Sequence, residues 1–115
     1  MATLTTSTDE YRKRVQALLT HYAQQSPVTG EIETQLIFDT EGDHYQLVTM
    51  GWQKHRRIYG CVLHIDIKDG KVWIQHNGTE RWVAEELAAA GIPPQQIVLG
   101  FHSPFTRQFT DFAVN

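Results

Sequence analysis

The sequence has little cysteine, no long apolar run and no excess of positive charge. Cys61 is the one cysteine among 115 residues, so the chain forms no internal disulfide and a reducing compartment is expected. No apolar run approaches the roughly 20 residues that a membrane-spanning helix requires, and the N-terminus lacks a secretory pattern. The net charge of −3 is not that of a typical nucleic-acid-binding domain. We therefore expect a cytoplasmic protein.

The sequence also lacks the familiar signatures of catalysis and cofactor binding. Neither GxGxxG nor GxxxxGK followed by Ser or Thr occurs, and Gly100-Phe-His-Ser-Pro does not match the GxSxG nucleophile motif. Cys61 is expected on the apolar face of a strand, where burial raises the pKa of a thiol and makes it inert. Asp39, Glu41 and Asp43 share one turn without the ligand pattern of a calcium loop. We predict no enzymatic activity, no catalytic residues and no cofactor.

What remains is the composition of one globular domain. Apolar residues make up 41% of the chain and charged residues 20%, and 115 residues is a usual domain length. We see no repeat or linker, so residues 1–115 are taken as a single domain. The predicted fold class is α+β. An N-terminal helix packs on an antiparallel meander of about four strands, a second helix follows the fourth strand, and a C-terminal strand or extended tail closes the chain.

The first helix is predicted for residues 8–25. Ser7 and Glu10 fit a capping box, and Ser26-Pro27 ends the helix because the residue before proline avoids the helical region. Apolar residues recur at helical spacing and form one stripe, made of Tyr11, Val15, Leu18, Leu19 and Tyr22. Strands are expected at 31–39 and 44–52, with a turn at 41–43 between them.

Asp69-Gly70 is a strong hairpin signal and sets the register of the third strand, 57–68, with the fourth. The register pairs Lys68 with Lys71, Ile67 with Val72, Asp66 with Trp73, Ile65 with Ile74 and His64 with Gln75. Strict alternation then predicts one buried face and one mixed face. The buried face holds Tyr59, Cys61, Leu63, Ile65, Ile67, Val72 and Ile74. The mixed face holds Ile58, Gly60, Val62, His64, Asp66, Trp73 and Gln75, and its tryptophan indicates a second cover.

The C-terminal part is predicted to contain a helix, a short strand and an aromatic tail. Thr79 is the expected N-cap of a helix at 80–90, and Gly91 ends this helix. Its inner side is predicted to carry Trp82, Val83, Leu87 and Ala90. A turn or single helical turn at 92–96 leads to a fifth strand or buried segment at 97–101. The tail at 102–115 contains Phe105, Phe109 and Phe112, so we expect it to pack on its own chain or on a partner.

His64, Asp66 and His76 suggest a metal cluster at first sight. The predicted register, however, places His64 and Asp66 on one face and His76 on the other, so one ion cannot reach all three side chains. Structural zinc sites also require four ligands at suitable spacing. We therefore predict no metal site and read these residues as polar groups on a half-exposed sheet face.

The strongest candidates for partner contact are basic and aromatic residues. Lys54-His55-Arg56-Arg57 is the one basic run and is predicted to form a hairpin loop, either as a solvated tip or as a contact for phosphates or an acidic partner. Protein interfaces are enriched in aromatic residues and arginine. The predicted partner-binding residues are Trp73, Arg57, Arg56, Phe105 and Phe109. For the aromatic residues, packing within the chain is the alternative.

Many short segments, in order along the chain, resemble the XisI family. They are Gly30-Glu-Ile-Glu, Phe38-Asp-Thr-Glu, His44-Tyr-Gln-Leu, Gly51-Trp52, Arg57, Tyr59-Gly-Cys, His64-Ile-Asp-Ile-Lys-Asp-Gly-Lys, Trp73-Ile-Gln, Asn77-Gly-Thr-Glu and Phe112-Ala-Val. The resemblance extends from about Tyr11 to Val114. Members of this family are the fdxN-element excision controlling factors of cyanobacteria. Asn77 and Trp82 depart from the family, which often has aspartate at the first position and a smaller residue at the second.

The resemblance implies an accessory role. XisI-like proteins are associated with programmed excision of a DNA element during heterocyst development, where a separate recombinase performs the strand chemistry. An XisH-like protein is usually encoded beside them. We therefore expect a non-catalytic protein-interaction module with an XisH-like partner. The alternatives are a direct DNA-binding factor that uses residues 54–57 and, thirdly, an enzyme with a polar pocket around His64 and Asp66. A homo-oligomer is compatible with each hypothesis.

Overall fold

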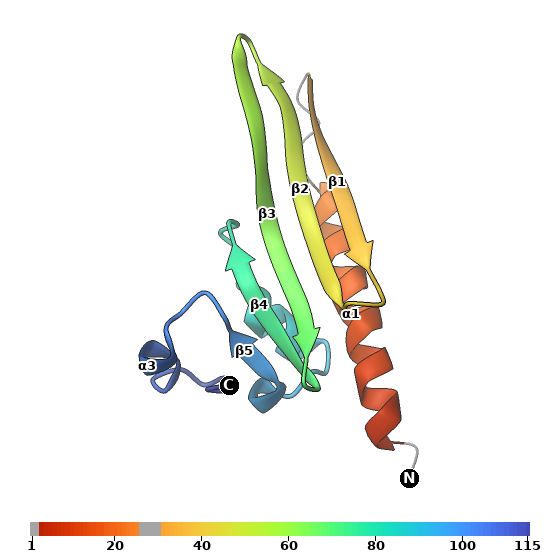
Figure 1. The fold of residues 1–115 in the computed structure, drawn as a ribbon, viewed down its shortest axis with the longest axis vertical. Helices are drawn as coiled ribbons and strands as arrows, with labels where there is room; N and C mark the ends of the chain where they lie inside the picture. The colour runs from red at the N-terminus through yellow and green to blue at the C-terminus, as the bar shows by residue number, and fades with distance from the viewer. Residues whose placement is uncertain (1–2, 26–30) are drawn as a thin grey trace.

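The computed structural model describes residues 3–25 and 31–115, and Figure 1 shows a twisted sheet with helices against it. The elements are α1 (Thr3–Gln25), β1 (Glu31–Asp39), β2 (His44–Gln53), β3 (Arg56–Lys68), β4 (Lys71–Asn77), α2 (Val83–Ala89), the 3-10 helix η1 (Pro94–Gln96), β5 (Ile97–Leu99) and α3 (Pro104–Arg107). The five strands follow the order β1-β2-β3-β4-β5. Strands β1 to β4 are antiparallel, and β5 runs parallel to β4. The predicted α+β class is confirmed.

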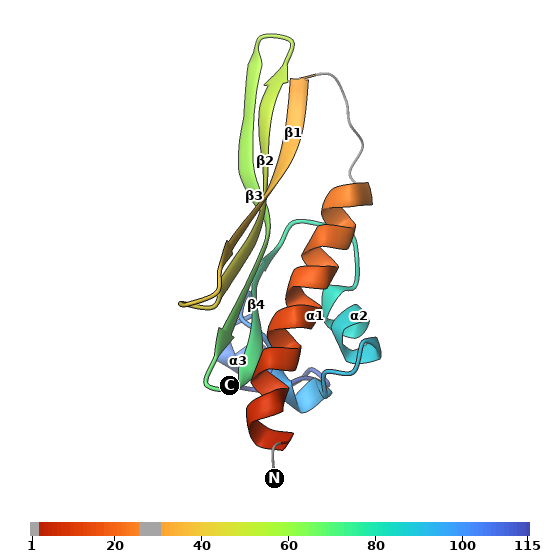
Figure 2. The same cartoon turned by 90° about the vertical axis from the view of Figure 1, so that its right-hand side faces the viewer.

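The hydrophobic core lies between the sheet and the two longer helices, which cover the same side of the sheet (Figure 2). From α1, Val15, Leu19 and Tyr22 are buried in this core. We call the sheet face toward α1 the inner face, and its buried members include Tyr45, Leu47, Leu63, Ile65, Ile67, Val72 and Ile74. Each fully buried aliphatic side chain contributes roughly 1.5–3 kcal/mol. The burial of Val15, Leu19 and Tyr22 confirms the predicted apolar stripe of the first helix.

The predicted start of the first helix is wrong. Helix α1 begins at Thr3, so Ser7 lies within the helix rather than at its cap. Serine and threonine are only moderately unfavourable inside helices, which allows the helix to continue through this polar segment. The predicted stop at Ser26-Pro27 lies outside the described residues, and α1 is described as far as Gln25.

A β-bulge at Val62 changes the faces of β3. Leu47 pairs with Leu63, but the next residue of β2, Val48, pairs with Cys61, so Val62 is an additional residue on β3. A bulge of this kind shifts the alternation of side chains by one position. On the side of the bulge near α1, the predicted inner face is confirmed. Beyond the bulge, the inward and outward positions are exchanged.

This exchange corrects two of the predicted core positions. Tyr59 and Cys61 share the outer face with Val48 instead of continuing the inner face. Tyr59 is 71% exposed, and Cys61 is exposed as well. Partial burial of its Sγ raises the pKa of Cys61, and the thiol donates a hydrogen bond to the Leu63 carbonyl.

A second bulge lies between β3 and β4. Ile65 pairs with Ile74 as predicted, whereas His64 pairs with His76, so Gln75 is the additional residue. The predicted pairing of His64 with Gln75 is therefore wrong. Directly opposed residues share a face. The argument that His64 and His76 lie on opposite faces is wrong for the same reason.

The turns between the strands agree better with the sequence. Asp69 and Gly70 have φ angles of 54° and 76°, which are the angles of a type I′ hairpin turn. The β2–β3 turn is shorter than predicted, since only Lys54 and His55 lie between the strands. Arg56 and Arg57 belong to β3.

Helix α2 begins later than predicted, because the predicted cap residue lies in a turn after β4, where its Oγ1 accepts a hydrogen bond from the Arg81 amide at 3.1 Å. The Asn77 Oδ1 accepts hydrogen bonds from the Thr79 amide at 2.9 Å and from the Thr79 hydroxyl at 2.5 Å. Thr79 therefore closes a turn after β4 and does not cap the helix, which starts at Val83 after Trp82. Trp82 is 74% exposed, and Ala90 is exposed too, so neither belongs to the inner side of α2 as predicted.

The predicted end of α2 at Gly91 is confirmed. Gly91 has a φ of 111°, a conformation that glycine adopts at low cost. Its amide donates to the Ala88 carbonyl at 3.0 Å, and the Ile92 amide donates to the Leu87 carbonyl at 3.1 Å. These bonds form a Schellman motif and bring Ile92 into the core.

Asp43 ties α1 to the turn between β1 and β2. The Arg12 Nε donates to the Asp43 Oδ1 at 2.8 Å, and the Arg12 Nη2 donates to the Oδ2 at 3.0 Å. The Tyr45 hydroxyl donates to the same Oδ1 at 2.8 Å. The hydrogen bonds from Arg12 outweigh the effect of burial and lower the pKa of Asp43. Burial and the bond to Asp43 raise the pKa of Tyr45 to about 12.

Asp43→Asn is a test of this connection, because asparagine keeps the side-chain size and tolerates the positive φ of 61°. We expect the Tm at pH 7 to fall by roughly 5 °C, since one weakened charged hydrogen bond at a partly exposed site costs on the order of 1 kcal/mol. The folded-state pKa of Asp43 is lowered, so this stabilisation is complete above the unfolded pKa and is lost as the pH falls through the folded pKa. The difference in Tm should shrink below pH 3.8, the ordinary pKa.

Asp9→Asn is the matched control. Asp9 also accepts a hydrogen bond from Arg12, at 2.6 Å, but its side chain is 63% exposed. We expect its removal to change the Tm by less than roughly 2 °C. Calorimetry at pH 7 and at pH 3 measures the Tm of both variants. Equal effects of the two substitutions would contradict the assignment of Asp43 as the main connection.

Candidate interaction surfaces

The distal parts of β1, β2 and β3 form an arm that extends beyond the C-terminal end of α1 (Figure 2). The turn at Lys54 and His55 is the tip of this arm, and the molecule measures 53 × 32 × 24 Å. Because the helix does not reach the tip, side chains on both faces of the arm meet solvent there. Among the described helices, none is long and apolar enough to cross a membrane.

The outer face of the arm carries an aromatic and cationic group, which we call the arm surface: Met50, Trp52, Arg57 and Tyr59. The register pairs Trp52 with Arg57 and Met50 with Tyr59, so the side chains are cross-strand neighbours. The Arg57 guanidinium lies 5.5 Å from the Trp52 ring centroid, and its Nη1 donates to the Gly51 carbonyl at 3.4 Å. Trp52 is 47% exposed. Arg57 and Trp52 thus form a cation–π pair, whose position is fixed by the backbone pairing of β2 with β3.

Gly51 allows β1 to approach this part of β2. Its φ is 151°, and a Cβ atom at this position would lie 2.0 Å from the Glu31 carbonyl oxygen. Glu31 pairs with Trp52, and Glu33 pairs with Met50. The arm surface is therefore flanked by acidic side chains along β1.

Trp73 lies at the other end of the sheet, where the chain itself covers it. The Lys68 Nζ is 4.6 Å and the Arg107 guanidinium 5.2 Å from the Trp73 ring centroids. The Arg107 Nε donates to the carbonyls of Leu99 at 3.2 Å and His102 at 3.0 Å. Trp73 is half-buried, and its buried Nε1 has no acceptor among the described residues. The second cover indicated by the sequence is thus the C-terminal segment.

Two of the three tail phenylalanines remain exposed. Phe105 and Phe109 are 68% and 72% exposed and contact each other edge to face, with ring centroids 5.3 Å apart. We call them the tail pair. Phe112 is half-buried and packs against the core. The expectation of intramolecular packing therefore holds for Phe112, while the tail pair presents apolar surface to solvent.

The five predicted partner-binding residues do not form one surface. Arg56 and Arg57 lie near the tip of the arm, whereas Trp73 pairs with Asp66 near the opposite end of β3. The tail pair lies on and after α3, which Figure 1 shows beside β5 and away from the arm. Trp52 was missed, because its position beside Arg57 follows only from the register of β2 with β3.

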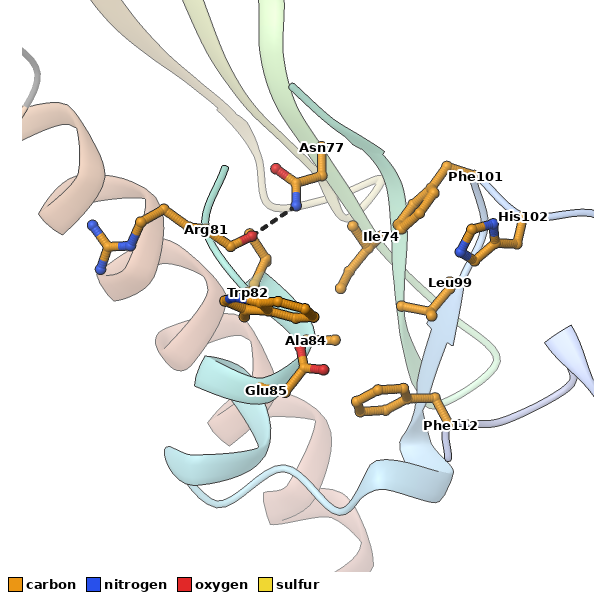
Figure 3. A pocket seen from close by; sticks show the side chains of 11 residues that line it. Ile74, Asn77, Arg81, Trp82, Ala84, Glu85, Leu99, Phe101, His102 and Phe112 are labelled. Carbon is orange, nitrogen blue, oxygen red and sulfur yellow. Dashed lines mark hydrogen bonds between the residues drawn. The ribbon is translucent and has the colours of Figure 1, made fainter. Parts of the chain in front are cut away.

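A small aromatic pocket opens between β4, the start of α2 and the C-terminal segment (Figure 3). Its volume is about 170 Å³, and its lining includes Trp82, Phe101 and Phe112. The Asn77 Nδ2 donates to the Arg81 carbonyl at 3.1 Å at one side of the pocket (Figure 3). Small-molecule sites usually measure roughly 300–1,000 Å³. This pocket is of a size to receive a single side chain.

The outer face also holds a histidine–aspartate cluster, formed by His44, His64 and Asp66. The His44 Nδ1 lies 2.9 Å and the His64 Nε2 lies 2.8 Å from the Asp66 Oδ1. Burial alone would raise the pKa of Asp66, but the hydrogen bonds from both histidines outweigh it and the pKa is lowered. The hydrogen bond to Asp66 and its negative charge raise the pKa of His44. The sequence had suggested His76 as a third member, and His44 was missed.

Arg107→Met tests how the C-terminal segment is held. Methionine keeps most of the packing on Trp73 but loses the hydrogen bonds to the Leu99 and His102 carbonyls. The Ala113 amide donates to the Ile97 carbonyl at 2.9 Å, and its hydrogen exchange should become at least roughly 5-fold faster, since the loss of even one hydrogen bond costs about 1 kcal/mol. Arg56→Met on the arm is the control. Unchanged exchange at Ala113 in the Arg107 variant would disprove this role.

Comparison with known proteins identifies the family. The family described as XisI protein matches residues 5–114. The crystal structure of a XisI-like protein from Anabaena variabilis has 49% sequence identity and a TM-score of 0.90, over 94% of this chain and 99% of that one. The fdxN element excision controlling factor XisI from Anabaena variabilis has 31% identity and a TM-score of 0.82, over 95% and 99%. No curated protein gives a match. The chain belongs to the XisI protein family.

Proposed function

We propose that this protein is a non-catalytic accessory factor that controls excision of a DNA element in the cytoplasm by binding a protein partner. The relative from Anabaena variabilis that is named an fdxN element excision controlling factor aligns over 95% of this chain. An XisH-like protein is the partner that we propose. The family relationship supports the role in excision control, and the arm surface supports the interaction.

The arm surface is the observation that carries the proposal. It combines two exposed aromatic rings, those of Trp52 and Tyr59, with the guanidinium of Arg57. Tryptophan, tyrosine and arginine are the residues most enriched among those that dominate binding energy at interfaces. The β2–β3 pairing holds their backbones, so less conformational freedom is lost on binding. The projection of the arm beyond α1 leaves this surface open to a large partner.

Direct DNA binding is the second candidate, and the position of the basic residues supports it. Lys54, His55 and Arg56 are exposed at the tip of the arm, where they can reach a phosphate backbone. Arg57, however, is engaged with Trp52, and Glu31 pairs with Trp52 on the neighbouring strand. With the net charge of −3, this arrangement favours a protein partner over DNA.

Light scattering on a sizing column tests the main proposal, with the protein alone and mixed with the XisH-like protein of the same genome. We expect a stable mixed complex. Trp52→Ala combined with Tyr59→Ala should weaken binding in calorimetric titrations by at least roughly 30-fold, because interface hot spots cost about 2 kcal/mol or more. Phe105→Ser combined with Phe109→Ser is the matched control, since it removes two exposed aromatic rings at the other end of the sheet.

The outcomes separate the parts of this proposal. A mixture that does not form a complex would disprove the XisH-like partner. A complex lost in the tail-pair variant and kept in the arm variant would transfer the interface to the tail pair. A homo-oligomer that the arm variant dissociates would show that the arm surface binds a second copy of the chain.

The DNA alternative has its own measurement. If the arm tip binds phosphates, the affinity for duplex DNA, followed by fluorescence anisotropy, should fall steeply as salt increases. Lys54→Gln combined with Arg56→Gln should reduce the slope of log K against log salt by about 2. Binding that is absent at low salt, or unchanged in this variant, would eliminate the alternative.

A further inference from the structure

We propose that the histidine–aspartate cluster of His44, His64 and Asp66 is a binding site for a divalent transition-metal ion such as zinc. The sheet brings the three residues together. His64 and Asp66 are two positions apart on β3 and therefore share a face. His44 on β2 is the direct cross-strand partner of Asp66. Each residue offers one ligand atom, and these atoms lie within 4.8 Å of one another.

The spacing of the ligand atoms suits an ion of this size. Zinc lies about 2.0–2.2 Å from nitrogen and oxygen ligands in tetrahedral geometry, which separates its ligands by roughly 3–3.5 Å. The His44 Nδ1 and the His64 Nε2 already converge on the Asp66 Oδ1 at 2.9 and 2.8 Å. Small side-chain rotations, together with a shift of each imidazole proton to the other ring nitrogen, therefore replace the shared hydrogen-bonded arrangement by a shared ion.

The type of ligand selects the class of metal. Two imidazole nitrogens and one carboxylate suit zinc, copper, nickel or iron, whereas magnesium and calcium prefer sites made of oxygen atoms alone. Because metal ligands bind in their deprotonated forms, Asp66 binds as a carboxylate and each histidine as a neutral imidazole. The cluster therefore supplies one full negative charge and two neutral nitrogen ligands once both imidazoles turn a lone pair toward the ion.

A neighbouring side chain orients the carboxylate. The Gln75 Nε2 donates to the Asp66 Oδ2 at 3.2 Å, which leaves the Oδ1 directed toward the two histidines. Support of this kind around the ligands is a regular feature of metal sites. The bulge at Gln75 keeps this residue beside Asp66, although the predicted pairing with His64 is absent.

The site is accessible and incomplete. The side chains are 56% exposed for His44, 29% for His64 and 14% for Asp66, so an ion can enter from solvent. Three protein ligands leave a fourth zinc position for water or for a ligand from another molecule. This inference is independent of the arm surface and of the partner proposed above.

Calorimetric titration of zinc chloride into chelator-treated full-length protein at pH 7.5 tests the site. We expect saturable binding of one ion per chain. His44→Ala should weaken the affinity at least ~10-fold, and because this side chain is largely exposed the variant is expected to fold. Asp66→Asn is a second variant that preserves side-chain size. His55→Ala and His76→Ala remove exposed histidines outside the cluster and should change the affinity less than ~2-fold.

Cobalt substitution provides a second measurement that does not depend on affinity. The cobalt-loaded protein should show visible absorption bands of a four- or five-coordinate ion, and His44→Ala should lose them. Absence of saturable zinc binding would overturn the proposal. The proposal would also be overturned if the His44→Ala and Asp66→Asn variants kept the zinc affinity of the unmodified protein while the His55→Ala or His76→Ala variant lost it. That result would show adventitious binding to surface histidines.

Discussion

The bulge at Val62 is the constraint that sets which residues of β3 share the outer face in both proposed binding regions of the sheet. If the register of the arm continued past this residue, His44 would pair with Ile65, and the apolar residues of β3 would share a face with His44 and Trp52. The additional residue instead places Asp66 opposite His44 and turns Ile65 to the inner face. Toward the tip, Tyr59 shares the outer face with Met50 and Trp52. A single extra residue in β3 thus sets which side chains meet solvent at both ends of the strand.

The bulge also marks where the sheet stops contributing to the core. On the α1 side of Val62, the inner face is filled by Leu63, Ile65 and their neighbours, and α1 covers them. Beyond it, the inner positions of β2 and β3 include Gly51 and Gly60, which have no side chains to bury. The aromatic rings of the arm are therefore not an extension of the core. Their exposure supports the partner-binding role proposed for the arm surface.

The sequence predicted well those structural features that depend on the geometry of neighbouring residues. The stripe of α1, the strand at 31–39, the turn at Asp69-Gly70 and the stop at Gly91 follow from residue type and spacing, and the structure confirms them. Bulges leave no comparable signature, because neither Val62 nor Gln75 differs from an ordinary strand residue. The predicted N-cap failed for a related reason: Thr79 suits an N-cap, but it forms a turn with Asn77 and Arg81, and α2 starts only at Val83. The sequence predicts Arg56 and Arg57 in the hairpin loop, next to their position at the start of β3, whereas Trp52 and His44 required the register.

Asp43, in the turn before β2, and the first two residues of the strand show how closely contacts for stability and the proposed ligands are interleaved. Asp43 holds α1 through Arg12, and Tyr45 points into the core and donates a hydrogen bond to Asp43. His44 between them faces outward and contacts Asp66. Alternation along the strand gives adjacent residues opposite environments. A substitution at His44 therefore leaves the connection between α1 and the sheet intact, so the chemistry of the outer face can be altered while the fold is kept. The alternation of β2 separates the two faces at this point, and the bulge at Val62 completes the polar cluster of the outer face by placing Asp66, rather than Ile65, opposite His44.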